Sequence, residues 1–244
     1  MKEIENEPLL NQSEEEMEKI EELKINETIR KGFIVKVYSL LLIQLALTFG
    51  FVILGNEIKV ISFFIVKHAL LYIIILFIPL IIMIFFICKP EKTKQVPLNY
   101  ILLFLFTISE AYTLTLFTLE FQKKYIYFSM LLTLIAVLTL TIYASKTKKD
   151  FTLLGGTLCV FLVLLIIGQI FNLFFRIKFL YLIFNIIGIC LFSIYIIYDT
   201  QLIIGNKERK ISEDYYILAV IILYLDIIIL FMDILSAFGK KNKK

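Results

Sequence analysis

Long apolar runs separated by short polar or basic stretches make up most of the chain from residue 33 onward. A helix needs about 20 apolar residues to cross the roughly 30 Å hydrocarbon core of a membrane. The runs are apolar on every side, without the alternation of barrel strands, and helices satisfy their own backbone hydrogen bonds in lipid. Seven segments reach or approach this length: 33–54, 69–88, 100–119, 125–144, 151–175, 179–204 and 215–238. The pattern predicts an all-α membrane protein built as a bundle of seven hydrophobic helices.

The polar ends of the chain differ from this middle region. Residues 1–29 hold ten of the 21 acidic residues and only three of the 25 basic ones. Such a segment cannot bury a core of its own, so residues 1–32 are expected to form an acidic, disordered tail. Residues 33–239 are expected to form the transmembrane bundle, and residues 240–244 a basic C-terminal tail.

The composition agrees with a membrane protein. Hydrophobic residues make up 60% of the chain and the mean hydropathy is +0.89, whereas soluble domains are about half apolar and about a quarter charged. The bases lie in small clusters between apolar runs, which excludes a nucleic-acid-binding face. The three cysteines lie in different runs and there is one histidine, His68, so no zinc or redox motif is readable and no cofactor is expected. Membrane lipid is the expected contact.

Lysine and arginine residues in the connections indicate the orientation. Successive connections carry two, three, two, three, two and three bases, and the basic side of a membrane protein is normally cytosolic. The alternation predicts a cytosolic N-terminus. Seven spans place the lysine-rich C-terminus on the opposite side, although its charges favour the cytosol. Either the last segment dips into the membrane and returns, or the charge rule does not apply at this end.

Four acidic residues lie within or at the edge of apolar runs: Glu110, Asp199, Asp226 and Asp233. An acid at the centre of a spanning helix costs about 2.5–3.5 kcal/mol, and such residues usually face the bundle interior or an ion path. The midpoint between Asp199 and Asp226 falls between Ser212 and Glu213, in the connection between the last two segments. The two aspartates are therefore expected at similar depth, which permits contact.

Two carboxyl groups in one dry site cannot both ionise easily, so they would share a proton and titrate as a unit. Such a pair can sense pH, relay protons, bind a cation or hydrolyse a peptide. A Ca²⁺ ion prefers about six to eight oxygen ligands. Two aspartates would therefore form only a weak, transient Ca²⁺ site, which suits an ion that must also leave.

Several motifs resemble the transmembrane BAX inhibitor motif family, and most strongly its Lifeguard branch with the Golgi anti-apoptotic group. They include VPLNYILLFLFTISEAYTL at 96–114, IIYDTQLI at 196–203 and LYLDIIILF at 223–231. The resemblance covers about residue 29 to the C-terminus. It implies seven helices with the last one central, and a pH-sensitive Ca²⁺ leak channel of Golgi or ER membranes that lowers luminal Ca²⁺ and protects against cell death.

By the same resemblance, Asp199 and Asp226 are the pH-sensing pair in the core of the bundle. Glu110 and Asp214 match acids of the Golgi branch and are candidates for the ion path. Asp233 stands where relatives carry neutral or histidine residues, and it is a further candidate for the path.

Two other classes of function remain open from the residues. A non-conducting membrane regulator would act through protein partners, using the acidic tail or the KKNKK end, and its buried acids would be structural. An intramembrane aspartyl protease also pairs aspartates on adjacent spans, and the YD of Tyr198–Asp199 matches that group. The GxGD and PAL motifs of those enzymes are missing, so an enzyme is not expected. The sequence leaves the oligomeric state undetermined.

Overall fold

The computed structural model describes residues 7–67 and 69–242, and no β-strand occurs in this part of the chain. The α-helices are α1 (Glu7–Glu57), α2 (Lys59–Lys67), α3 (Ala69–Cys88), α4 (Leu98–Thr118), α5 (Lys123–Lys146), α6 (Gly155–Phe175), α7 (Lys178–Ile204) and α8 (Tyr216–Phe238). Short 3-10 helices lie in three connections: η1 (Pro90–Lys94), η2 (Thr152–Leu154) and η3 (Glu213–Tyr215). The prediction of an all-α bundle is confirmed.

The seven apolar segments correspond to α1 and α3 to α8. Among the described residues, six of these helices are long and apolar enough to cross a membrane, and α3 contributes a shorter apolar stretch, Ile74–Cys88. The short helix α2 was not expected as a separate element. It occupies the connection between the first two apolar segments and begins two residues after α1 ends.

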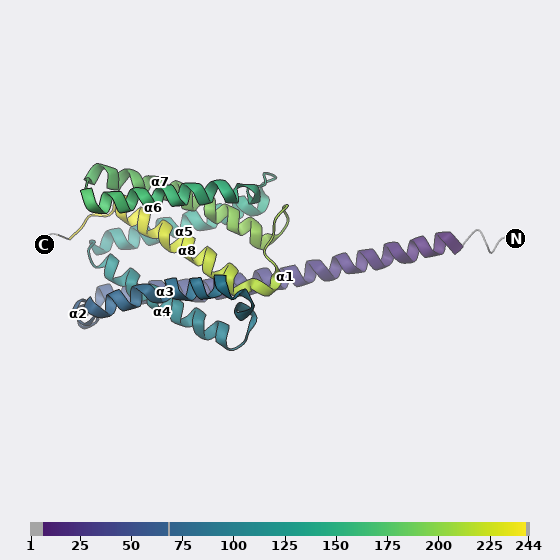
Figure 1. The fold of residues 1–244 in the computed structure, drawn as a ribbon, viewed down its shortest axis with the longest axis horizontal. Helices are drawn as coiled ribbons and strands as arrows, with labels where there is room; N and C mark the ends of the chain where they lie inside the picture. Colours follow the sequence, from purple (N-terminus) through teal and green to yellow (C-terminus); the bar gives the residue numbers. More distant parts are fainter. Residues whose placement is uncertain (1–6, 68, 243–244) are drawn as a thin grey trace.

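Helix α8 lies between two groups of helices (Figure 1). On one side α4 packs against α1 and α3, and on the other α7 packs against α5 and α6. Within its most apolar stretch 72% of the α8 residues are buried, against 17% in α5 and in α6. The last helix is therefore the central one, as the resemblance implied, and α5 and α6 are peripheral.

The two ends of the chain leave the bundle at opposite ends (Figure 1). Helix α8 runs through the bundle without turning back, so the possibility that the last segment dips in and returns is wrong. Beyond α8, the backbone N–H of Gln122 donates to the carbonyl of Lys240 at 2.9 Å, and that of Asn242 donates to Glu120 at 2.8 Å. The described part of the C-terminal tail is thus attached to the connection between α4 and α5.

The described part of the acidic N-terminal segment continues α1 outward from the bundle (Figure 1). Helix α1 begins at Glu7, and residues 1–6 lie outside the described part of the chain; the expectation of a disordered tail stays a prediction. Its residues from Lys19 to Ile29 are exposed, so no tertiary packing supports this part of the helix. The division of the chain at residue 32 stays a prediction.

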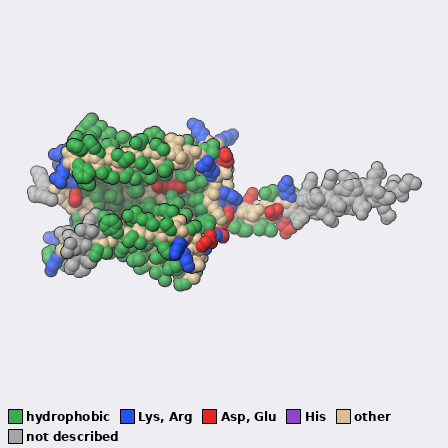
Figure 2. Space-filling view, in the orientation of Figure 1, with side chains coloured by type: hydrophobic (Ala, Val, Ile, Leu, Met, Phe, Trp, Pro, Cys, Tyr) green, Lys and Arg blue, Asp and Glu red, His purple; other side chains and the backbone are tan. Residues whose placement is uncertain are grey.

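The outer surface of the bundle is apolar. Figure 2 shows hydrophobic side chains over its middle, lysine and arginine at its two ends, and a few acidic side chains within a hollow of the apolar surface. Large side chains of α5 and α6 are well exposed, and they include Leu131, Leu134, Phe161, Leu164 and Phe174. An exposed apolar area of this extent on a multi-span bundle is a lipid-facing surface. The protein is a multi-pass integral membrane protein whose outer helices contact lipid.

Replacing Gly205 by alanine should destabilise the bundle. Gly205 ends α7 with a φ of 70°, and an added Cβ would lie 2.5 Å from the guanidinium of Arg30. The left-handed backbone alone costs a residue with a Cβ about 1–2 kcal/mol, and displacing Arg30 adds to this cost. Reversible unfolding in mixed micelles would measure the loss. Gly156→Ala is the control, because a Cβ at Gly156 meets nothing within 4 Å; equal losses would contradict the prediction.

Candidate functional site

Asp199 of α7 and Asp226 of α8 meet in the interior of the bundle. Their exposed fractions are 3% and 6%, and their carboxyl groups interact with each other. The Oδ2 atom of each finds no donor among the described residues. The expectation from sequence was only that similar depth permits contact, and the packing of α7 against α8 brings the two groups together.

The surroundings of the pair contain no balancing positive charge. In the described part of the chain neither aspartate forms a salt bridge. The tyrosines Tyr195 and Tyr198 of α7 interact electrostatically with the pair. An ionised carboxylate only accepts hydrogen bonds, so a bond between the two groups requires a proton on one of them. The geometry therefore suits a pair that shares a proton.

Glu110 lies apart from this pair, on α4. It is partly buried and interacts electrostatically with Tyr224 of α8, whose hydroxyl lies 2.9 Å from the Thr48 hydroxyl of α1. No hydrogen bond or ion pair joins Glu110 to Asp199 or Asp226 within the described residues. Glu110 thus belongs to a second polar contact of α8, on the side of α1 and α4.

Asp214 lies at the surface, in η3. Its carboxylate accepts a hydrogen bond from Lys94 at 3.0 Å, and this bond raises the pKa of Lys94 above its usual value. The Asp214 side chain is 67% exposed, so the structure places it at the end of the bundle, outside the buried core. A role for Asp214 in an ion path stays a prediction.

Asp233 lies two turns after Asp226 on α8, at about 10 Å along the helix axis. Its exposed fraction is 5% and its Oδ2 has no partner in the described structure. It faces Gly188 of α7, where an added Cβ would collide with the carboxylate. The three aspartates that lie where α7 packs against α8 are therefore Asp199, Asp226 and Asp233. Glu110 and Asp214 lie elsewhere.

A comparison with known proteins assigns the family. Residues 30–243 match the family described as Inhibitor of apoptosis-promoting Bax1. The chain belongs to this family. It is 28% identical to Protein lifeguard 3 of Homo sapiens over 218 residues, which are 88% of this chain and 70% of the relative. It is 33% identical to Protein LIFEGUARD 4 of Arabidopsis thaliana over 217 residues, 86% of this chain and 85% of the relative. The recognition from sequence is confirmed.

The Bax inhibitor match begins at Arg30, a residue to which the sequence reasoning gave no role. Arg30 donates to the carbonyls of Leu202 at 2.6 Å, Ile211 at 2.5 Å and Ile204 at 3.2 Å, and to the carboxylate of Glu213 at 2.8 Å. It therefore caps the C-terminal end of α7, where helix carbonyls lack partners. A base directly before the first span was the available signal, but its partners are far away in sequence.

Gln201 organises the same end of the Bax inhibitor bundle. Its amide donates to the carbonyl of Lys149 at 3.0 Å and accepts from the backbone N–H of Phe151 at 2.8 Å. Beside it, the hydroxyl of Thr152, with backbone N–H groups, keeps the pKa of Asp150 below its usual value. These contacts hold the α5–α6 connection against the end of α7, two residues after Asp199.

The oxygen ligands available for a cation at the pair are few. Among the described residues, no group of three or more histidine, cysteine, aspartate or glutamate side chains could hold a metal ion. Two carboxylates supply at most four oxygens, fewer than the six to eight that Ca²⁺ prefers. The pair fits a transient contact with a passing ion better than a storage site.

Proposed function

We propose that this member of the Bax inhibitor family is an anti-apoptotic membrane regulator that lets Ca²⁺ leak out of the lumen of the Golgi or ER. The observation that carries the proposal is the buried contact of Asp199 with Asp226, with no basic side chain paired to either among the described residues. With one shared proton the carboxyl groups hold α7 to α8. Loss of that proton leaves two like charges in contact, which weakens this contact and creates a cation site.

Charge distribution supports a cytosolic N-terminus. The connections with three bases each meet at the end of the bundle from which α1 projects: Lys94 binds Asp214 at 3.0 Å, and Lys207 donates to the carbonyl of Thr147 at 2.9 Å. The connections at the opposite end carry two bases each. The more basic end is placed in the cytosol by the positive-inside rule, so the C-terminal end of α8 would face the lumen.

A flux measurement on the full chain tests the proposal. Protein reconstituted into vesicles loaded with Ca²⁺ should release Ca²⁺ faster than protein-free vesicles. Release should increase as the pH rises through neutrality, because deprotonation of the pair adds negative charge to the path. Glu27→Gln is the control, since this acid lies on the part of α1 outside the bundle with its side chain 72% exposed; it should change neither release nor its pH profile. Wild-type vesicles that release no more Ca²⁺ than empty ones would refute the leak.

A non-conducting regulator is the second candidate, and one feature favours it. The part of α1 outside the bundle exposes Ile20, Leu23, Ile25 and Ile29, each at least half exposed. An apolar set on an extended helix is a typical surface for a partner helix. Two results together would favour this function. The wild type would show no Ca²⁺ flux, and it would form a stable complex with another membrane protein that Leu23→Glu abolishes.

An aspartyl protease remains the least supported alternative. A contacting aspartate pair also suits acid–base hydrolysis, but the motifs of such enzymes are missing and the family names describe inhibitors and lifeguard proteins. Cleavage of a transmembrane substrate that is lost in Asp226→Asn would reverse this order.

A further inference from the structure

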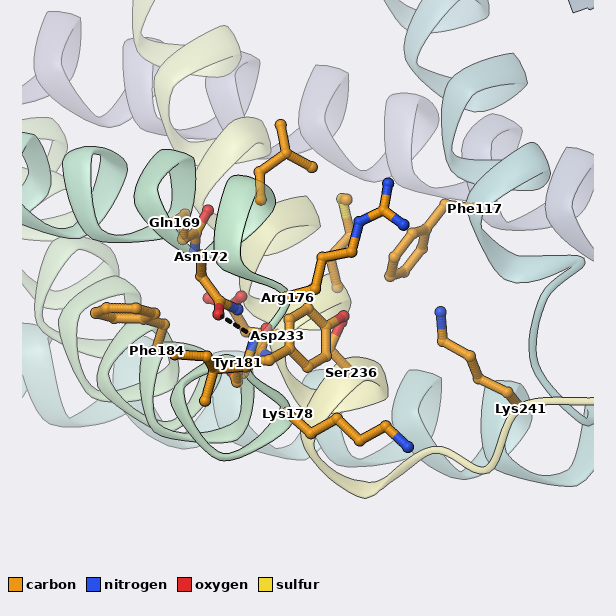
Figure 3. A pocket seen from close by; sticks show the side chains of 14 residues that line it. Phe117, Gln169, Asn172, Arg176, Lys178, Tyr181, Phe184, Asp233, Ser236 and Lys241 are labelled. Atoms are coloured by element: carbon orange, nitrogen blue, oxygen red, sulfur yellow. Dashed lines mark hydrogen bonds between the residues drawn. The ribbon is translucent and has the colours of Figure 1, made fainter.

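A cavity of about 760 Å³ opens at the end of the bundle where α8 finishes. Its walls come from α6, α7 and α8, with Phe117 of α4 and Lys241 of the C-terminal segment completing the lining. Figure 3 shows Asp233 among these side chains, with Arg176, Lys178 and Lys241 around it. Asp199 and Asp226 do not line this cavity, so it is separate from the aspartate pair.

Asp233 supplies a buried carboxyl group to the cavity. Only 5% of its surface is exposed, and its Oδ2 has no partner among the described residues. Gly188 leaves the space that the carboxylate occupies. A buried acid without a partner is costly in a folded protein unless a ligand or proton satisfies it.

The rim supplies positive groups that do not reach this acid. Arg176 and Lys178 are exposed and form no salt bridge in the described structure. Arg176 occupies the turn between α6 and α7 with a φ of 53°. Lys241 is neutralised by Glu120 at 2.6 Å. The cavity thus has two cations at its mouth and one acid inside it, and no ion pair joins them among the described residues.

Charge complementarity limits what can satisfy both sites. A lone cation would have to pass the basic mouth, and a lone anion would meet the carboxylate inside. A molecule with an ammonium at one end and a phosphate beside it satisfies both. The neighbouring α6 residues Leu173 and Phe174 are 71% and 77% exposed, so the mouth lies next to a lipid-facing surface.

We propose that this cavity binds the headgroup of an amine-bearing phospholipid. The ammonium donates to the Asp233 carboxylate, and the phosphate lies against Arg176 and Lys178. An acyl chain follows the apolar lining formed by Phe117, Phe184 and Met232. The assignment does not depend on the proposed Ca²⁺ leak, because it uses none of the residues of the aspartate pair.

Lipid titration of the full chain in mild detergent, followed by native mass spectrometry, tests this assignment. Phosphatidylethanolamine should bind about tenfold more tightly than phosphatidylglycerol, which has the phosphate without the ammonium. Asp233→Asn should abolish this preference, and Arg176→Gln combined with Lys178→Gln should weaken both lipids equally. Lys124→Gln, which removes an exposed base outside the cavity lining, is the control and should leave binding unchanged.

Two further arms identify the source and the chemistry of the ligand. Free phosphoethanolamine should compete with the lipid only weakly, since it lacks the acyl chain. Phosphatidylcholine should bind less tightly than phosphatidylethanolamine, because its quaternary ammonium has no N–H to donate. Equal binding of phosphatidylethanolamine and phosphatidylglycerol by the wild type, or an unchanged preference in Asp233→Asn, would overturn the proposal. Displacement of the lipid by free phosphoethanolamine at equal concentration would show a soluble ligand instead.

Discussion

Replacing Asp199, Asp226 or both by asparagine should remove the pH dependence of Ca²⁺ release to the same extent. In the proposed mechanism the two interacting carboxyl groups share one proton, so losing either group removes that proton. Release above neutral pH should fall about tenfold, since the passing cation loses a charge-assisted contact with one carboxylate, worth about 1.5–3 kcal/mol. Release from reconstituted vesicles across a pH series would measure both effects.

Unfolding experiments on the same variants separate function from stability. An asparagine amide can donate to the remaining carboxylate, and it removes a buried ionisable group, so the folded state should be as stable as the wild type or more so. If the pair is coupled, each single variant should change release as much as the double variant does. A double variant whose effect equals the sum of the two single effects would contradict a coupled pair. Asp233→Asn separates the pair from the third buried acid on this contact. It is equally buried on α8 but forms no hydrogen bond with the pair among the described residues, so the pH response of the pair should persist in this variant even if the size of the release changes.

Replacing Arg30 by alanine should lower the free energy of unfolding by about 2–4 kcal/mol, more than the loss of any other charged side chain at the ends of the bundle. Arg30 supplies donors to two backbone carbonyls at the end of α7, to the carbonyl of Ile211 in the following connection and to Glu213. Its side chain is 11% exposed, whereas Glu213 is 31% exposed; water can therefore compensate Glu213 better than the helix carbonyls. Reversible unfolding in mixed micelles would measure the loss.

Lys31 provides the control for Arg30. It is the next residue in the chain, its side chain is 77% exposed, and it lies 3.7 Å from Glu27, which is 72% exposed. Exposed pairs of this kind contribute about 0.2–1 kcal/mol or nothing measurable. Lys31→Ala should therefore leave stability almost unchanged. A similar loss in both variants would mean that the charge near the membrane surface, and not the cap on α7, stabilises the bundle.

The candidate residues were predictable to different degrees. Asp199 and Asp226 stand out in sequence because an acid in an apolar run is expensive, and their positions relative to the last connection indicate equal depth. Glu110 and Asp214 were grouped with them as candidates, but the fold places these two on other contacts of the bundle. Arg30 was missed because its partners lie 172 to 183 residues away, and no local pattern contains that information.

The sequence by itself determined the class of protein and the helices. Apolar runs of spanning length must form helices in lipid, because no water is present to satisfy the backbone. It could not tell which face of each helix meets lipid, since lipid tails and a protein interior are both apolar. Only the tertiary structure decided that Asp199 interacts with Asp226 and that Asp233 faces a cavity with basic residues at its mouth. It also decided that α8 finishes at the end of the bundle opposite the one from which α1 projects. These depend on side-chain packing between helices distant in sequence.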